Sequence, residues 1–348
     1  MKNSIQIRKK ALFALVIAVS IGFPFTSLGQ GVSKVGTTVG DFLQIGVGPR
    51  ALGQGGAFVA AANDISALYW NPAGLAAASG TEIFVTHSEW LANINFDYIG
   101  VGLNLGSKGS LGFSLTRLGV PEMLVRTEDR QDGTGELFDA ADMAAAVTYS
   151  RKVTDRFAVG GTVKYISQRI WNSTASAFAI DIGTQFRTDF FGNLTIGAAI
   201  FNFGTDLQMS GRDVRTFVDP DPRHLGNNNA VPVNYELDSF KLPLNFQFGI
   251  SSRPIFTRMH QLTINVDALH PSSNNESVNV GVEYGFQSIV FLRTGFQSLF
   301  LEEREGGYSA GVGIHQVLFD KSTAKLDYAY RAAGRLGGIH VIGLALSF

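Results

Sequence analysis

From residue 81 onward, apolar residues alternate with polar or small ones. The alternation is clearest in LPLNFQFGIS at 242–251 and in VNVGVEYGF at 278–286. In a β-strand successive side chains point to opposite faces, so a period of two indicates strands with one apolar face and one polar or small face. The same period recurs in fourteen segments, at about 81–90, 96–105, 109–117, 141–153, 157–169, 174–188, 194–203, 242–252, 260–269, 276–286, 289–297, 308–316, 324–331 and 339–348.

The lengths and connections of these segments favour a membrane barrel. Most contain enough residues to cross a bilayer as tilted strands, for which about 9–11 are needed. The connections after even-numbered segments are short, whereas the two longest, 118–140 and 204–241, follow odd-numbered segments. Short turns on one side and long loops on the other are typical of outer-membrane barrels. The pattern predicts a closed 14-stranded antiparallel β-barrel over residues 81–348.

The stretch DISALYWNPAGLAAASG at 64–80 does not have the strand period. Asp64 can cap one helical turn, and Asn71 can cap a second turn that begins with Pro72. Gly74 and the alanines around it keep the second turn thin enough for a barrel mouth. We therefore assign residues 30–80 to an N-terminal helical plug, with a short surface helix outside the barrel as the alternative.

The N-terminus has the pattern of a secretory signal. Four basic residues lie within the first ten, and an apolar core follows at 11–25. We place cleavage after Gly29, so that residues 1–29 form the signal peptide. An N-terminal membrane anchor is the alternative, but the apolar core is shorter than the roughly 20 residues of a spanning helix.

The composition agrees with a barrel that faces lipid. The chain contains 40 Gly and 27 Phe, and only 16% of its residues are charged. A soluble all-β protein has the same period, so the composition favours lipid contact but does not exclude a soluble protein. Without the four basic residues of the leader, 24 basic residues face 29 acidic ones. This balance gives no support to nucleic-acid binding, which needs a basic surface.

The chain offers no convincing catalytic, cofactor or metal site. The sequence GVGPRA at 46–51 matches the letters G-x-G-x-x-A, but it lacks the βαβ context of a dinucleotide site. The six histidines are scattered, there is no cysteine, and no Gly-x-Ser-x-Gly elbow is present. We therefore predict no enzyme, no catalytic residue, no cofactor and no metal.

Several ionisable residues lie on the polar faces of predicted strands. They are Lys164, Asp181, Arg187, Asp267 and Glu283, and Asp97 and Asp327 fit the same description. Two interpretations remain open. These residues form a hydrogen-bonded lumen that stiffens the barrel, or they line a path for a polar permeant.

The long connection 204–241 combines mixed charge with aromatic residues. Loops held on a rigid scaffold are where binding residues concentrate. We predict a protein-binding loop, with a passive loop as the alternative. Its candidate contact residues are Arg212, Arg215, Phe217, Arg223 and Tyr235.

The last segment predicts how the barrel closes. Ile342, Leu344, Leu346 and Phe348 alternate with small residues, and the chain ends on the aromatic. This resembles the C-terminal signal of bacterial outer-membrane barrels. Because a lipid-exposed strand edge cannot remain unpaired, we expect this strand to pair with the first.

Three stretches before the first strand resemble the N-terminal signature of the PorV/PorQ family: FLQIG at 42–46, ALGQGGAF at 51–58, and 64–76 with its WNPAG core. The matched positions include Gly53, Gly55, Gly56, Asp64, Trp70, Asn71, Pro72 and Gly74. The resemblance implies a fourteen-stranded barrel of the FadL type in the outer membrane of a Bacteroidetes-type Gram-negative bacterium, in contact with its lipid.

The resemblance also implies two possible roles. Members similar to PorV serve type IX protein secretion, where they bind the secretion channel and the C-terminal signal domains of cargo. FadL-like members are passive channels for hydrophobic small molecules, with an N-terminal hatch in the lumen. The charged loops and the polar inward faces favour the secretion role, with the hydrophobic channel as the alternative.

Overall fold

The computed structural model describes residues 34–348, except 79, 222, 224–229, 302–303 and 320–321. The predicted signal peptide at 1–29 and the first four residues of the predicted plug segment lie outside the described residues. No helix in the described part of the chain is long and apolar enough to span a membrane.

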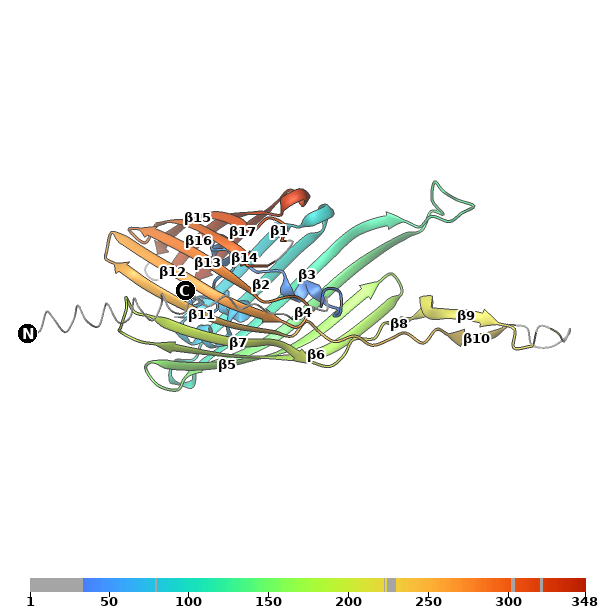
Figure 1. The fold of residues 1–348 in the computed structure, drawn as a ribbon, viewed down its shortest axis with the longest axis horizontal. Helices are drawn as coiled ribbons and strands as arrows, with labels where there is room; N and C mark the ends of the chain where they lie inside the picture. The colour runs from blue at the N-terminus through green and yellow to red at the C-terminus, as the bar shows by residue number, and fades with distance from the viewer. Residues whose placement is uncertain (1–33, 79, 222, 224–229, 302–303, 320–321) are drawn as a thin grey trace, which may run out of the picture. The chain divides into compact units, whose positions relative to one another are not determined.

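Fourteen strands form a closed antiparallel ring, as the sequence pattern predicts (Figure 1). Each strand pairs with its neighbour in the chain, β7 pairs with β11, and β17 returns to pair with β1. The strands are β1 (Thr81–Glu89), β2 (Asn95–Asn104), β3 (Ser110–Leu124), β4 (Leu137–Lys152), β5 (Phe157–Ile170), β6 (Ser173–Arg187), β7 (Thr195–Gly204), β11 (Asn245–Phe256), β12 (His260–Pro271), β13 (Ser277–Phe286), β14 (Val290–Leu299), β15 (Tyr308–Phe319), β16 (Ser322–Ala332) and β17 (Gly338–Ser347).

The ring closes at the two ends of the barrel sequence. The Phe348 N–H donates to the Thr81 carbonyl at 2.8 Å, and the Thr81 N–H donates back at 3.2 Å. Farther along the seam, Ile83 lies opposite Leu346. The expected pairing of the first and last strands is therefore present.

Strand β6 shows how the wall separates its two faces. Phe178, Ile180 and Ile182 point outward and are 59%, 47% and 59% exposed. The alternate residues Ala179 and Asp181 are buried on the inner side. An apolar outer belt with a polar interior is the pattern of a barrel that spans a bilayer.

Two details differ from the sequence-based expectation. Strands β3 and β4 continue their ladder beyond a register shift between Val120 and Met123. The connection between them is therefore 125–136 rather than 118–140. Asp97 is also not on the inner face, because the buried residues of β2 alternate through its neighbours Phe96 and Tyr98. It lies instead beside His87 on the outer face, at 2.7 Å.

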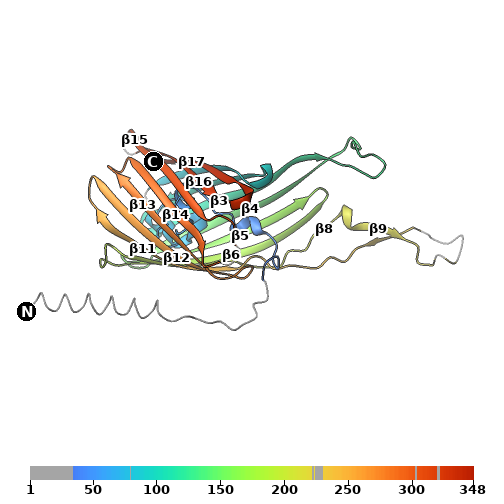
Figure 2. The same cartoon turned by 45° about the horizontal axis from the view of Figure 1, so that its top comes forward.

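A plug of short helices precedes β1. It contains η1 (Asp41–Gln44), α2 (Pro49–Leu52), α3 (Ala67–Trp70) and η2 (Pro72–Ala77). Element η2 packs against β3 to β6, and α2 packs against β15 to β17. Figure 2 shows the blue N-terminal segment among the strands of the ring. The plug therefore contacts the wall on both sides of the seam, as expected of a segment inside the barrel.

Glycines in the wall make room for the plug backbone. A Cβ atom on Gly197 would lie 2.6 Å from the Val59 carbonyl oxygen, and one on Gly160 would lie 2.6 Å from the Ala73 nitrogen. On the opposite wall, a Cβ on Gly281 would lie 2.8 Å from the Gln54 Cβ. Part of the high glycine content is thus explained by close approach of plug and wall.

The connections carry the remaining short elements. These are η3 (Leu91–Asn93), η4 (Gly106–Lys108), β8 (Ser210–Gly211), η5 (Arg212–Val214), β9 (Arg215–Val218), β10 (Val231–Asn234) and η6 (Gly334–Leu336). Strands β9 and β10 pair with each other as a hairpin within the long connection between β7 and β11.

Candidate functional site

Arg50 on α2 is the centre of the contact between plug and wall. Its Nε and Nη2 donate to the two carboxylate oxygens of Glu283 on β13, each at 3.0 Å. Its Nη1 donates to Asn63 at 2.8 Å and to Asp64 at 2.5 Å within the plug. Bidentate hydrogen bonds of this kind are the strong form of an arginine–carboxylate interaction. Arg50 thus joins the plug to the barrel wall.

The network continues from Glu283 along the wall. Arg293 on β14 donates from Nε to Glu283 at 2.7 Å and from Nη1 to Asp327 on β16 at 2.5 Å. His315 on β15 lies 3.4 Å from the same Asp327. The side chain of Arg293 is fully buried. Alternating charges along the network offset the cost of burying each one.

The plug end of this network has perturbed proton affinities. Burial opposes the charge of Arg50, but the carboxylates of Glu283 and Asp64 outweigh it and raise the pKa of its guanidinium. Burial likewise opposes the charge of Asp64, but Arg50 and Lys325 hold the pKa of its carboxyl below its usual value. Both groups are therefore ionised at neutral pH.

Asp267 on β12 makes a second contact with the plug. Its Oδ2 accepts the backbone N–H groups of Phe58 at 2.6 Å and Val59 at 2.8 Å. Asp267 is completely buried. A strand carboxylate thus satisfies two backbone donors in the middle of the plug.

Asn71 joins the two helical turns of the plug to the wall. Its side-chain oxygen accepts the Ala73 N–H at 3.1 Å, which caps η2 as the sequence suggests. Its Nδ2 donates to the carbonyl of Val59 at 2.8 Å and to that of Thr184 on β6 at 3.1 Å. The residue is completely buried.

The remaining signature residues also lie in or beside the plug core. The Trp70 Nε1–H donates to the Val47 carbonyl at 2.8 Å, and the Asp64 Oδ1 accepts the Ser66 N–H at 2.9 Å. Gly55 has a φ of +66°, and a Cβ there would lie 2.6 Å from the Phe296 nitrogen, so only glycine fits. The other signature residues at buried plug positions are Gly53, Gly56, Pro72 and Gly74.

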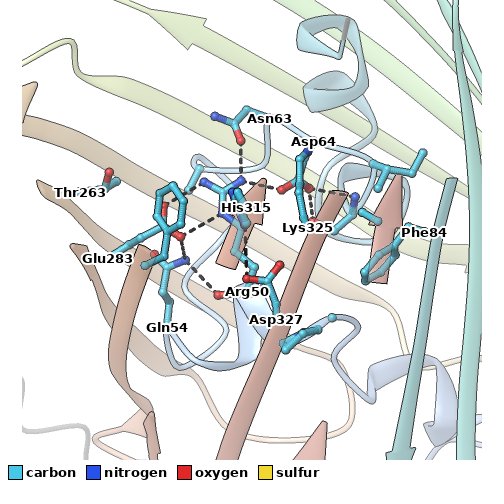
Figure 3. A pocket seen from close by; sticks show the side chains of 18 of the residues that line it. Arg50, Gln54, Asn63, Asp64, Phe84, Thr263, Glu283, His315, Lys325 and Asp327 are labelled. Carbon is cyan, nitrogen blue, oxygen red and sulfur yellow. Dashed lines mark hydrogen bonds and ion pairs between the residues drawn. The ribbon is translucent and has the colours of Figure 1, made fainter. Parts of the chain in front are cut away.

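Two of the cavities between plug and wall are large enough for a small ligand, and they lie toward opposite ends of the barrel. The first, of about 250 Å³, is lined by Arg50, Glu283, Lys325 and other charged residues (Figure 3). The second, of about 200 Å³, is lined mainly by uncharged polar residues. Strand β11 contacts the first cavity near its end, at Arg253, and the second at its start, at Asn245.

The long connection brings four of the five predicted contact residues onto or beside the β9–β10 hairpin. Phe217 and Tyr235 are 71% and 64% exposed, and Arg212 and Arg215 are exposed on the same segment. Arg223 is also exposed and lies 3.7 Å from Asp221, outside the bounds of both paired strands. All five residues are accessible, and they include aromatic and arginine side chains.

Arg50 and Arg293 are the arginines at the centre of this network, and neither was singled out from the sequence. Glu283 and Asp327 were expected on the inner face, and buried carboxylates require cationic partners. Arg293 lies on the inner face of the strand next to Glu283, and its place in the alternating pattern could have identified it from the sequence. The described residues bring together no group of three or more His, Cys, Asp or Glu that could hold a metal ion.

Solved structures with the same fold include hydrocarbon channels. The deltaS2S3 mutant of the TodX monoaromatic hydrocarbon channel is 12% identical, with a TM-score of 0.52, over 87% of this chain and 98% of that chain. The toluene transporter TbuX of Ralstonia pickettii is 13% identical, with a TM-score of 0.50, over 86% of this chain and 97% of that chain. At such low identity these similarities show the fold alone. The comparison with curated proteins found no match.

A family model agrees with the signature in the plug. The model described as type IX secretion system protein PorV matches residues 29–266. The match covers the plug and the barrel as far as β12, and it confirms the family indicated by the sequence. The closed fourteen-stranded barrel, its apolar outer face and this match together show that the chain is an outer-membrane β-barrel that belongs to the PorV family.

Proposed function

We propose that this protein serves type IX protein secretion in a Bacteroidetes-type bacterium as a non-enzymatic barrel. Its exposed loops bind the secretion channel, the C-terminal signal domains of cargo, or both. The family match over residues 29–266 is the observation that carries this proposal. The structural features below support it.

The plug seated in the lumen favours a role on the surface of the barrel. The plug is held by Arg50, Asn71 and the Asp267 carboxylate, and residues such as Phe58 and Leu75 are completely buried inside the ring. The buried ionisable residues contact the plug or one another. Of the two interpretations of the polar lumen, these contacts favour a stiffened interior over a path for a permeant.

The β9–β10 hairpin has the composition of a protein-binding surface. Aromatic residues and arginine are enriched where protein interfaces concentrate their binding energy. Phe217 and Tyr235 are exposed, and Arg215 lies on the same two-stranded unit. Because paired strands hold these side chains in place, binding a partner costs less conformational entropy than it would for an unstructured loop.

A hydrophobic channel is the second candidate, and one observation favours it. A cavity of about 390 Å³ lies beside the same long connection and is lined mostly by apolar residues, including Leu207, Met209 and Phe240. The TodX and TbuX structures, which share the fold, are described as a hydrocarbon channel and a toluene transporter. In this protein, passage of a ligand from that cavity through the barrel would require the plug to move.

The secretion role is tested with purified protein and an isolated cargo signal domain from the same organism. We expect the double substitution Phe217→Ala and Tyr235→Ala to weaken binding at least tenfold, because exposed aromatics of this kind act as interface anchors. Thr216→Ala, on β9 next to Phe217, is the matched control and should bind like the unmodified protein. Binding is measured by titrating the signal domain over the immobilised barrel protein.

Two results would contradict this proposal in whole or in part. If signal domains bind the double variant and the unmodified protein equally, the β9–β10 hairpin is not the binding surface. Normal secretion in a strain lacking the gene, together with uptake of toluene that depends on it, would replace the secretion role with the channel role.

A further inference from the structure

The end of the barrel with the short connections carries an excess of positive charge. Four consecutive turns lie there, at 105–109, 153–156, 188–194 and 257–259, and join β2 to β3, β4 to β5, β6 to β7 and β11 to β12. We call these turns, with the four residues that flank each on either side, the short-turn rim. Its charged residues are Lys108, Arg151, Lys152, Arg156, Arg187, Arg253 and Arg258, against Asp155 and Asp189.

This excess is local. The whole chain has 28 basic and 29 acidic residues. The connection 125–136, at the opposite end of β3 and β4, has two basic and four acidic residues. The turn 287–289, between β13 and β14 at the short-turn end, has no charged residue. The positive charge is therefore concentrated on one sector of one end of the barrel.

Several of these basic side chains have no acidic partner. Arg156 and Asp189 form an ion pair that joins two neighbouring turns. Within the described residues, Lys108, Arg151 and Arg258 make no ion pair, and all three are exposed. Their charge is therefore available to an anion outside the protein.

Arg151 shows which surface this charge faces. On β4, Tyr149 and Arg151 are exposed on either side of Ser150, which is buried. Both therefore lie on the outer face, in line with the apolar belt. The Tyr149 hydroxyl donates to the Lys108 carbonyl at 2.7 Å, so the neighbouring turn lies beside them. Because Arg151 stands at the end of its strand, it lies beyond the belt, where lipid headgroups begin.

Exposed aromatic residues lie among the basic ones. Phe190 and Phe191, in the turn between β6 and β7, are 71% and 66% exposed. Phe256, at the end of β11, is 60% exposed. Aromatic residues at the ends of barrel strands are typical of the girdle at the boundary between acyl chains and headgroups. The short-turn rim thus combines basic and aromatic side chains at the level of the headgroups.

The turn that carries two of these aromatics is held against β11. The Ser252 hydroxyl donates to the Phe191 carbonyl at 2.6 Å. The Arg253 N–H donates to the Gly192 carbonyl at 2.7 Å. Phe191 has a φ of +49°, a conformation that bulky residues rarely adopt. These bonds hold the turn in an unfavourable backbone conformation that leaves Phe190 and Phe191 at the surface.

We propose that the short-turn rim binds the headgroup phosphates of anionic phospholipid in the periplasmic leaflet of the outer membrane. The short turns of outer-membrane barrels face the periplasm. Clusters of about four to eight basic residues beside a membrane-spanning segment attract anionic lipid. A zwitterionic headgroup attracts them less, because its own ammonium neutralises its phosphate. The exposed aromatics favour lipid over an acidic protein, because they continue the belt that already contacts the bilayer.

The proposal does not rest on the secretion role. The turn 188–194 precedes β7, whereas the β9–β10 hairpin lies in the connection that follows it. The lipid contact and the proposed partner surface are therefore at opposite ends of the same strand, and each can be lost without the other.

The test uses the full mature protein, purified in a nonionic detergent and stripped of native lipid. Native mass spectrometry counts the lipids that bind from added phosphatidylglycerol, cardiolipin or zwitterionic phosphatidylethanolamine. We expect the two anionic lipids to bind at least about fivefold more tightly than phosphatidylethanolamine. A soluble polyglutamate peptide is the probe for an acidic protein partner, and we expect it not to bind.

Removal of charge from the rim gives the decisive comparison. We expect Arg151→Gln with Arg258→Gln to weaken phosphatidylglycerol binding about fivefold for each arginine and to leave phosphatidylethanolamine binding unchanged. Arg130→Gln, at an exposed position of the connection 125–136, is the matched control and should bind like the unmodified protein. Heat-dependent mobility on denaturing gels checks that each variant is folded. If the double variant does not fold, Arg258→Gln alone is compared.

Three results would overturn the proposal. One is equal binding of phosphatidylglycerol and phosphatidylethanolamine by the unmodified protein. Another is a preference for phosphatidylglycerol that persists at full strength in the folded arginine variant. The third is binding of polyglutamate in preference to lipid, which would assign the rim to a protein partner. Loss of signal-domain binding without loss of lipid binding would affect only the proposed secretion role.

Discussion

At the residue scale, Arg50 carries the strongest single link between plug and wall. Its guanidinium contacts Glu283 in the barrel and Asp64 in the plug, and its side chain is 21% exposed. It also lies over the Phe58 ring, 5.2 Å from the ring centre. Removal of one partner from such a network leaves uncompensated buried charge, which costs more than the network itself contributes.

We expect Arg50→Ala to lower the free energy of unfolding by about 3 kcal/mol. Glu283 would keep Arg293 as a partner, whereas Asp64 would lose its guanidinium. Arg50→Lys should recover only part of this loss, because an ammonium cannot make the same two-pronged contact. Guanidinium-induced unfolding in detergent, followed by tryptophan fluorescence, measures the change.

The matched control is Arg126→Ala in the exposed connection between β3 and β4. A surface substitution of this kind changes stability by less than about 0.5 kcal/mol. Equal unfolding curves for the Arg50 and Arg126 variants would show that the network does not hold the plug.

At the scale of elements, Asn71 is where the chain turns from α3 into η2. It takes an extended conformation, with φ −169° and ψ 108°, and its side chain bonds both to the next turn and to β6. Pro72 follows at the first position of η2, where its missing N–H costs nothing. The helix cap predicted at Asn71 from the sequence is thus also an attachment point to the wall.

Two substitutions separate these roles of Asn71. We expect Asn71→Ser to keep the cap of η2 but lose the donors to Val59 and Thr184, at a cost of about 2 kcal/mol. Asn71→Ala loses the cap as well and should cost about 1 kcal/mol more. Hydrogen exchange at the amides of residues 73–78 measures both losses as reduced protection. Equal protection in both variants and the unmodified protein would contradict the assignment.

The elements themselves could be largely predicted from the sequence, because strand period and turn chemistry are local. All fourteen strands lie where the alternation predicts them, and the signature turns form helices. The period does not say which face points inward, however. In β2, Phe96 and Tyr98 are buried against the plug. A plugged barrel has an apolar interior at that level, so the rule that polar residues face inward assigned Asp97 to the wrong side.

At the scale of the molecule, the decisive contacts join residues far apart in the chain. Arg50 bonds to a residue 233 positions away, and Phe58 to one 209 positions away. Local patterns carry no information about such pairs, so the charge network could not be predicted even though several of its members were expected on inner faces. The closing pair of the ring was predictable, because every membrane barrel must satisfy its strand edges.

The side chain and the backbone of Phe348 have separable roles in that closure. We expect Phe348→Ala to reduce severalfold the fraction of protein assembled in the outer membrane. The purified variant should lose less than about 0.5 kcal/mol of stability, because the ring is 56% exposed and the bonds to Thr81 remain. Heat-dependent mobility on denaturing gels measures assembly.

Phe348→Tyr, which keeps an aromatic ring, is the control and should assemble normally. Assembly of Phe348→Ala at the level of the unmodified protein would show that the terminal aromatic ring is not read during insertion.

The fit between wall glycines and plug backbone has a consequence for the order of biogenesis. The plug precedes β1 in the chain, and the ring is completed only when β17, the last strand, meets β1. Glycines such as Gly160 and Gly197 leave no clearance for a methyl group between wall and plug. We therefore expect the nascent sheet to curl around a plug that is already seated, so that the segment before β1 acts as the template on which β17 completes the barrel.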